Sequence, residues 1–392
     1  MPHRLTLSAL AAAAALTVIP ASGMGAIAAL QDDRLAATPL ADIPARLDAA
    51  KATGVRVARV DLFWNEIAPT QPANPTDPND PAYDWRTSDA KIQGYLDRGI
   101  TVLVSVYSSP TWATGGLKAD DSQYNPFAPA AGTYGPFMQA VATRYSGSFT
   151  PAGRSTPLGR VRLIEVWNEP GIEEFLRNAD GSSQVPTYLR LLREAYPAVK
   201  AGNPSAIVIA GVASPRSSDG DGNVGSRTWL RRIAGAPLSV KFDAYSQHVY
   251  PAAAPISRTR AFPSWNSMNE IFATLDARRA REIRAARGAK RRALIRKPKM
   301  KLYITEAGYT TATTPFRTVK VSDAQQATYM RQIFNHPQVR NQKRISAIFW
   351  FNYQDNPNWP GGIIREDGSQ KPAYSVFTSL TPKGALTPDL RP

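Results

Sequence analysis

The stretch LIEVWNEP at residues 163–170 and the stretch KLYITEAG at residues 301–308 share one pattern, an apolar run of strand length that leads into a glutamate. The two glutamates are Glu169 and Glu306. Similar runs recur along the chain, each preceded by a helical stretch and followed by a polar or Pro/Gly-rich loop. In a parallel sheet, all such strand ends lie at one face, so both glutamates can point into one pocket.

Expected strands and helices alternate along the whole chain. Strands are expected at 26–31, 55–63, 101–107, 162–167, 206–212, 242–248, 301–305 and 346–351. Helices are expected at 43–53, 88–98, 135–145, 187–201, 228–233, 267–289, 323–334 and 371–380. This order predicts an α/β fold with a buried parallel sheet. Eight units, with no glycine-rich phosphate fingerprint after the first strand, favour a closed (β/α)8 TIM barrel over an open sheet.

Composition and the N-terminal residues narrow the class of protein. The chain has 392 residues, of which 43% are hydrophobic, enough for one large core. A basic start and a short apolar run before Pro20 predict a signal peptide at 1–23, and therefore a secreted or periplasmic protein without a membrane span. After the signal peptide we expect a single barrel domain at 24–380 and a C-terminal tail at 381–392. The chain has no cysteine, which excludes disulfides and thiolate chemistry.

Positive charge is concentrated in one segment. Residues 278–301 hold twelve basic residues and one acid, and so carry +11 of the formal charge of +16. A solvated arginine-rich helix is the plainer interpretation, and contact with an acidic polysaccharide or an anionic envelope is the alternative. A nucleic acid is not an expected partner, because no aromatic residues interleave with the charges.

Two carboxyl groups in one pocket have the chemistry that glycosidic cleavage needs. One attacks the anomeric carbon, and the other protonates the departing oxygen. Their mutual repulsion separates the two pKa values, so that one group stays protonated. A single glutamate at a strand end would more often be a surface residue or an ion-pair partner. No His/Asp/Glu cluster has the spacing of metal ligands along the sequence, so we expect neither a metal nor a cofactor.

WNEP at 167–170 after an apolar strand, followed much later by ITE at 304–306, resembles clan A of the glycoside hydrolases, families 39 and 5 in particular. The resemblance covers residues 55–380. It implies a retaining β-glycosidase on a TIM barrel, with Glu169 as acid/base and Glu306 as nucleophile. It also implies that Asn168 bonds the sugar 2-hydroxyl. Retention predicts carboxyl groups about 5–5.5 Å apart.

Further positions match the clan in the same way. Arg59 resembles an arginine that holds the nucleophile ionised, although a purely structural ion pair is the alternative. His248 and Tyr250 resemble a His-x-Tyr motif, in which the tyrosine orients the nucleophile and the histidine lines the pocket. A lone strand histidine is more often a satisfied core residue. Asp61 and Glu66 are candidates for contact with substrate, although a helix cap or a surface pair is the plainer interpretation.

Aromatic residues near strand ends are candidates for stacking on sugar rings. Trp350 resembles the clan's tryptophan beneath the sugar, and Trp350–Phe351 is expected to be a cis peptide. Trp64 and Trp112 are expected in substrate subsites, and Trp359 is a weaker candidate. The residues SSPTW at 108–112 stand where many family 5 members have a histidine, so cellulase or mannanase specificity does not transfer.

The sequence therefore predicts an exported, monomeric, retaining hydrolase that acts on a carbohydrate. One alternative is a transglycosylase, which would use the same carboxylates and a sugar acceptor. The other is a carbohydrate-binding protein that keeps the barrel without turnover. The sugar, its linkage and endo or exo action depend on loop shapes that the sequence does not reveal.

Overall fold

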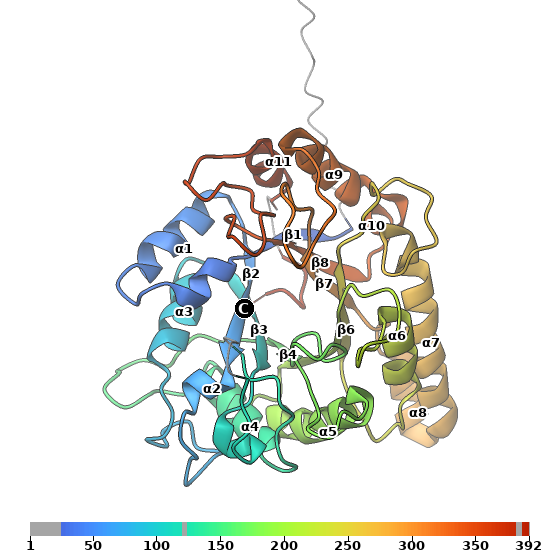
Figure 1. Ribbon diagram of the computed structural model, residues 1–392. Coiled ribbons are helices and arrows are strands. Elements are labelled where there is room, and N and C mark those ends of the chain that lie inside the picture. Colours follow the sequence, from blue (N-terminus) through green and yellow to red (C-terminus); the bar gives the residue numbers. More distant parts are fainter. Residues whose placement is uncertain (1–24, 120–123, 382–385, 392) are drawn as a thin grey trace, which may run out of the picture.

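The chain folds into a closed barrel of eight parallel strands in the order β1 to β8 (Figure 1). The computed structural model describes residues 25–119, 124–381 and 386–391, so the predicted signal peptide lies outside the described residues. The strands are β1 (Ile27–Gln31), β2 (Val57–Phe63), β3 (Thr101–Tyr107), β4 (Leu163–Val166), β5 (Ile207–Ala213), β6 (Ala244–Val249), β7 (Leu302–Ala307) and β8 (Ile345–Phe351). The predicted TIM barrel is confirmed.

Helices surround the barrel in Figure 1. They are α1 (Ile43–Ala52), α2 (Trp64–Ile67), α3 (Arg86–Asp97), α4 (Tyr134–Arg144), α5 (Gln184–Gly202), α6 (Ser226–Gly235), α7 (Met268–Ala285), α8 (Gly288–Arg296), α9 (Asp323–Asn335), α10 (Pro337–Arg340) and α11 (Pro372–Leu380). Three 3-10 turns accompany them, η1 (Asp33–Ala37), η2 (Thr111–Thr114) and η3 (Trp265–Ser267). None of the described helices combines the length and apolarity that crossing a bilayer demands.

The single helix expected at 267–289 is in fact two helices. The backbone is extended at Ala286 and at Arg287, which separates α7 from α8. Gly288, which begins α8, has a φ of +53°, a conformation that glycine adopts with little strain. The break therefore comes at the one glycine of the basic segment.

Side chains alternate along each strand between two apolar layers. Residues that face outward, such as Val104 and Ile348, pack against the helices in the larger cluster. Residues that face inward, such as Leu103 and Phe349, fill the lower half of the barrel in a smaller cluster. The inward positions nearer the carboxyl ends of the strands carry polar side chains instead, so these ends are where a site can form.

The end of the described chain closes the other end of the barrel. Leu386 and Leu390 join the inner apolar cluster and are 5% and 0% exposed. Asp389 accepts hydrogen bonds from Tyr303 and Ser346, at the start of β7 and β8. The segment predicted as a tail thus belongs, from residue 386, to the packed structure.

Replacing Leu390 with alanine is expected to lower the free energy of unfolding by about 2–5 kcal/mol, because a buried leucine is lost and a cavity remains. Chemical denaturation would measure the change. Leu40→Ala, the same change at a leucine that is 50% exposed, should alter stability by less than about 0.5 kcal/mol. Equal effects of the two variants would contradict a packing role for the segment.

Candidate active site

The two glutamates lie together in the barrel mouth. Glu169 follows β4 and Glu306 lies in β7, the fourth and seventh strands, and they are only 8% and 9% exposed. One carboxylate oxygen of each lies within 4.8 Å of the other. That separation suits the retaining spacing of about 5–5.5 Å rather than the 6.5–9.5 Å, approximately, of inverting enzymes.

The backbone that presents Glu169 is strained. Trp167 and Glu169 have φ values of +72° and +37°, and neither is a glycine. Such conformations cost of order 1–3 kcal/mol each and persist only where the surroundings enforce them. Here the Trp167 indole donates to the carbonyl of Phe175 at 2.7 Å. The turn from Trp167 to Glu169 thus places the side chains of two successive residues, Asn168 and Glu169, in the barrel mouth.

Arg59 is the centre of the site's hydrogen-bond network. It is 1% exposed and donates from Nη1 to Glu306 at 3.0 Å and from Nη2 to Asn168 at 2.8 Å. Its remaining donors bond Glu165 at 2.9 Å, Gln31 at 2.7 Å and Ser105 at 2.9 Å. The guanidinium is therefore held rigidly against one oxygen of Glu306, while Asn168 is oriented through its side-chain oxygen.

Asp61, expected at a helix cap or surface pair, lies in the mouth instead. Its carboxylate is 3.3 Å from Arg59 and accepts from Gln31 at 2.9 Å. Sequence reasoning also missed Glu165 and Gln31. The alternation of strand side chains was a usable signal for Asp61, because it lies two residues after Arg59 on β2 and so faces the same way.

The other oxygen of Glu306 is held by Tyr250, whose hydroxyl donates to it at 2.8 Å. His248 lies opposite Glu306 in the β6–β7 register. Its Nδ1 is 2.5 Å from Glu169 and 3.4 Å from Glu306, so the imidazole lies between the two carboxyl groups. Burial lowers the pKa of His248, and the neighbouring Glu306 acts in the opposite direction.

The pKa values of the two carboxyl groups differ. This difference allows one group to be ionised while the other keeps its proton. Burial raises the pKa of Glu169 to about 8. Burial also raises the pKa of Glu306, but only to about 7, because the positive charges of His248, when protonated, and of Arg59 favour its ionised form. As the pH rises, Glu306 therefore loses its proton before Glu169 does.

This order predicts a bell-shaped dependence of kcat/KM on pH. Activity should rise as Glu306 ionises, with a pKa of about 7, and fall as Glu169 loses its proton, with a pKa of about 8. In Tyr250→Phe the ionised form of Glu306 loses a hydrogen bond, so its pKa rises and the acid limb should move up by about one pH unit. The alkaline limb should stay in place. A rate that falls by the same factor at every pH, with no shift of the acid limb, would contradict this role for Tyr250.

Among the described residues, Glu169, His248 and Glu306 are also the group that could hold a metal ion, since one ligand atom of each lies within 4.8 Å of the others. The sequence alone did not reveal this grouping, because the three residues come from β6, β7 and the loop after β4. The close contact between Glu169 and His248 uses two of these atoms within the protein.

For the glycoside hydrolysis that the sequence predicts, a metal chelator is expected to leave kcat/KM unchanged within about twofold, because two carboxyl groups can carry out that reaction without an ion. The measurement compares protein dialysed against EDTA with untreated protein. Activity that disappears on dialysis and returns with Zn²⁺ or Mn²⁺ would contradict the expectation.

The structure corrects the prediction for Trp350. Ala347 and Phe349 face into the barrel, so Trp350 faces outward, where it packs in the outer cluster and donates to the Gly361 carbonyl at 3.0 Å. Phe351 takes the inward position at the end of β8. The non-proline cis peptide is correspondingly Phe351–Asn352, one bond later than predicted.

Phe351 contributes to an aromatic wall beside Glu306. Its ring centroid is 6.4 Å from that of Tyr250 and 5.7 Å from that of Trp359, and the Tyr250 and Trp359 rings are 4.7 Å apart. Phe351 and Trp359 are both partly exposed. These two rings are thus better placed than Trp350 to contact a sugar.

A subsite role for Trp64 is also corrected. The residue is 0% exposed, and its ring stacks on Phe137 of α4 at 5.2 Å, so it has no face left for a ligand. Trp112 packs edge-on against Trp64 at 5.6 Å and donates to the Ala68 carbonyl at 2.9 Å. It remains partly exposed, and so it stays a candidate.

Solved structures that share the fold include several glycoside hydrolases. A family 39 glycoside hydrolase from Bacteroides cellulosilyticus WH2 is 19% identical, with a TM-score of 0.58, over 93% of this chain and 64% of that one. A family 39 β-xylosidase from Caulobacter crescentus is 17% identical, with a TM-score of 0.59, over 92% and 72%. A glucosidase from Croceicoccus marinus is 17% identical, with a TM-score of 0.58, over 85% and 62%.

These neighbours, family 39 and related clan A enzymes, confirm the fold that the sequence resemblance implied. The chain spans less than two thirds of the length of the first and third structures, at 64% and 62%. No protein-family model and no curated protein matches the chain. At identities of 17–19%, the likeness to solved structures shows the fold alone.

Proposed function

We propose that this protein is a secreted retaining glycoside hydrolase that cleaves β-O-glycosidic bonds by double displacement. One observation carries the proposal. Two buried carboxyl groups from opposite sides of a barrel mouth lie within 4.8 Å of each other, and only one of them is held by a guanidinium and a tyrosine hydroxyl. This asymmetry is what nucleophile and acid/base roles require.

The proposed nucleophile is Glu306. Arg59 and Tyr250 each donate to one of its oxygens, which favours the carboxylate and orients it. In the first step the carboxylate attacks the anomeric carbon, and Glu169 transfers its proton to the departing oxygen. A glycosyl ester on Glu306 and a free alcohol result.

In the second step Glu169, now ionised, takes a proton from water as the water attacks the same carbon. The bond to Glu306 breaks, and the sugar leaves with its original configuration. Asn168 is suited to donate to the 2-hydroxyl from its amide nitrogen, since its oxygen is occupied by Arg59. His248, at 2.5 Å from Glu169, positions the acid/base.

The experiment is a screen of the purified protein on aryl β-glycosides and soluble β-glycans, followed by NMR of the first product formed. A β-configured first product supports the proposal, and an α-configured one contradicts retention. Inclusion of a sugar acceptor distinguishes hydrolysis from transfer, because a transglycosylase would yield a longer β-glycoside. Binding of glycans without any turnover would favour a carbohydrate-binding protein.

A further inference from the structure

The basic segment 278–301 lies far from the barrel mouth. It forms the end of α7, the whole of α8 and the loop that leads into β7. Because that loop enters β7 at the start of the strand, the segment belongs to the end of the barrel opposite Glu306. Figure 1 shows α7 and α8 on the outer wall of the molecule.

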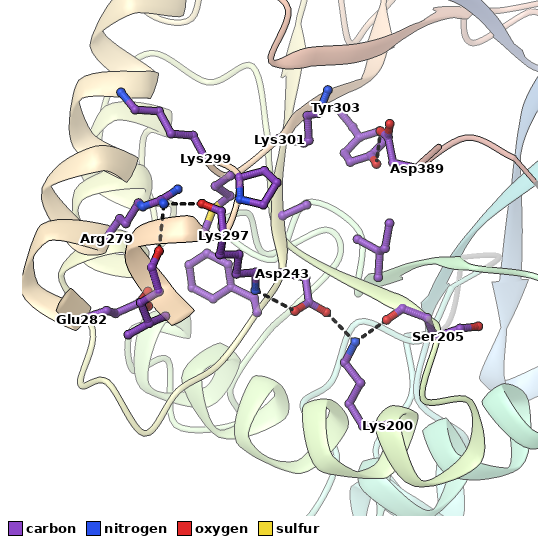
Figure 2. A pocket seen from close by; sticks show the side chains of 17 residues that line it. Lys200, Ser205, Asp243, Arg279, Glu282, Lys297, Lys299, Lys301, Tyr303 and Asp389 are labelled. Carbon is purple, nitrogen blue, oxygen red and sulfur yellow. Dashed lines mark hydrogen bonds and ion pairs between the residues drawn. The ribbon is translucent and has the colours of Figure 1, made fainter. Parts of the chain in front are cut away.

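The cations on the inner side of the segment are occupied within the protein. They line a cavity of about 320 Å³ between α7, α8 and the barrel (Figure 2). In and beside it, Lys297 lies 3.9 Å from Asp243, and Lys299 pairs with Asp276 at 2.9 Å. Arg279 donates to backbone carbonyls at the end of α8. The Arg279 bonds attach the end of α8 to α7, and the lysine contacts direct those ammonium groups toward acids of the protein.

The cations on the outer side are different. Six of them are exposed, and their side chains form no hydrogen bond or ion pair within the described residues: Arg284, Arg287, Lys290, Arg291, Arg292 and Arg296. Four of the six lie on α8, a helix of nine residues and therefore about 13 Å long. The segment thus presents a dense array of unpaired positive charge.

The residues of α8 favour a helix by intrinsic propensity, but the helix has little support from its surroundings. It has no buried residue and no acidic residue, so neither core packing nor oppositely charged pairs along its surface support it. Arg292 and Arg296 lie one turn apart and repel each other. Negative charge supplied from outside would relieve this repulsion, which is a physical reason to expect a polyanionic partner.

We propose that the outer face of α8, with Arg284 and Arg287, binds an acidic polysaccharide and so attaches the protein to an anionic matrix. Ile295, 56% exposed, is the only large exposed apolar residue of the described helix, too little for insertion into a membrane. The segment contains no aromatic residue on which nucleic acid bases could stack. A sugar polymer with regularly spaced carboxylates can bind through ion pairs with these cations alone, without an apolar or aromatic contact.

Binding at this face leaves the barrel mouth open, because the two lie at opposite ends of the strands. The attached protein would therefore keep its site accessible to a separate glycan. The proposal does not depend on the hydrolase activity, and each can be tested without the other.

The test measures retention on immobilised polygalacturonate. Wild-type protein should bind at about 0.1 M salt and elute by about 1 M, where the screening length falls from roughly 10 Å to 3 Å. A variant with Lys290→Gln, Arg291→Gln, Arg292→Gln and Arg296→Gln should bind about tenfold or more weakly. A control with Arg154→Gln, Arg160→Gln, Arg193→Gln and Arg331→Gln loses equal charge from other exposed positions and should bind as wild type does.

Limited trypsin digestion gives a second readout, since polygalacturonate should protect the cleavage sites at Arg291, Arg292 and Arg296. Equal binding by wild type and the α8 variant would overturn the proposal, as would equal weakening in the control. Tighter binding to anionic lipid vesicles or single-stranded DNA would overturn the choice of partner. Turnover of a small aryl glycoside should be the same in all three proteins, which separates this test from that of the hydrolase.

Discussion

Replacing Glu306 with alanine is expected to reduce kcat on aryl β-glycosides by on the order of 10⁵-fold, the scale on which loss of a catalytic nucleophile is measured. Without the carboxylate, no glycosyl ester forms and the double displacement has no first step. Steady-state rates on a nitrophenyl glycoside measure the loss. Circular dichroism establishes whether the barrel is intact, as it should be, because Arg59 keeps its other partners.

Azide distinguishes this role from a structural one. In Glu306→Ala, azide fits the space of the missing carboxylate and attacks from the same face, so an α-glycosyl azide is expected from an activated β-glycoside. Glu66→Ala removes an exposed carboxylate just beyond β2 and should leave the rate within about twofold. Full activity of Glu306→Ala, or a β-configured azide from it, would disprove the assignment.

Replacing Glu169 with alanine is expected to lower kcat by about 10²- to 10⁴-fold on substrates with poor leaving groups, because general acid catalysis is lost. With a dinitrophenyl glycoside the first step needs little protonation and should remain fast. The second step still lacks its base, so a burst of dinitrophenol followed by slow turnover should appear. Mass spectrometry should then detect the sugar attached to Glu306.

Azide should restore turnover of Glu169→Ala and give a β-glycosyl azide, the opposite configuration to that from Glu306→Ala. Glu174→Ala is the matched control, since this exposed carboxylate lies five residues away and acts on Glu169 only by raising its pKa. Losses in Glu169→Ala that are equal for good and poor leaving groups would contradict an acid/base role.

The barrel and the meeting of Glu169 with Glu306 were predictable because both depend on local patterns. Apolar runs define the strands, and a parallel barrel brings the strand ends together whatever the separation along the chain. Arg59, Asn168, His248 and Tyr250 were placed by the resemblance, and the structure brings all four to the two glutamates.

The remaining errors have physical causes that a sequence pattern does not contain. Trp350 and Phe351 are neighbours on β8, and a shift of one residue exchanges the inside of the barrel for the outside. Trp64 looked like a mouth residue, but its burial depends on α4, which lies far along the chain. Asp61 and Glu165 belong to a network around Arg59 that only the closed barrel assembles.

The contacts of Arg59 have one more consequence, for attempts to improve the protein in the laboratory. A single guanidinium connects residues of β1, β3 and β7 and both Glu165 and Asn168 with its own strand β2. Variation at this position would remove side-chain contacts that join five strands, together with the charge beside Glu306. Activity and thermal tolerance therefore cannot be selected separately at Arg59, and libraries aimed at new specificity should vary the aromatic wall instead.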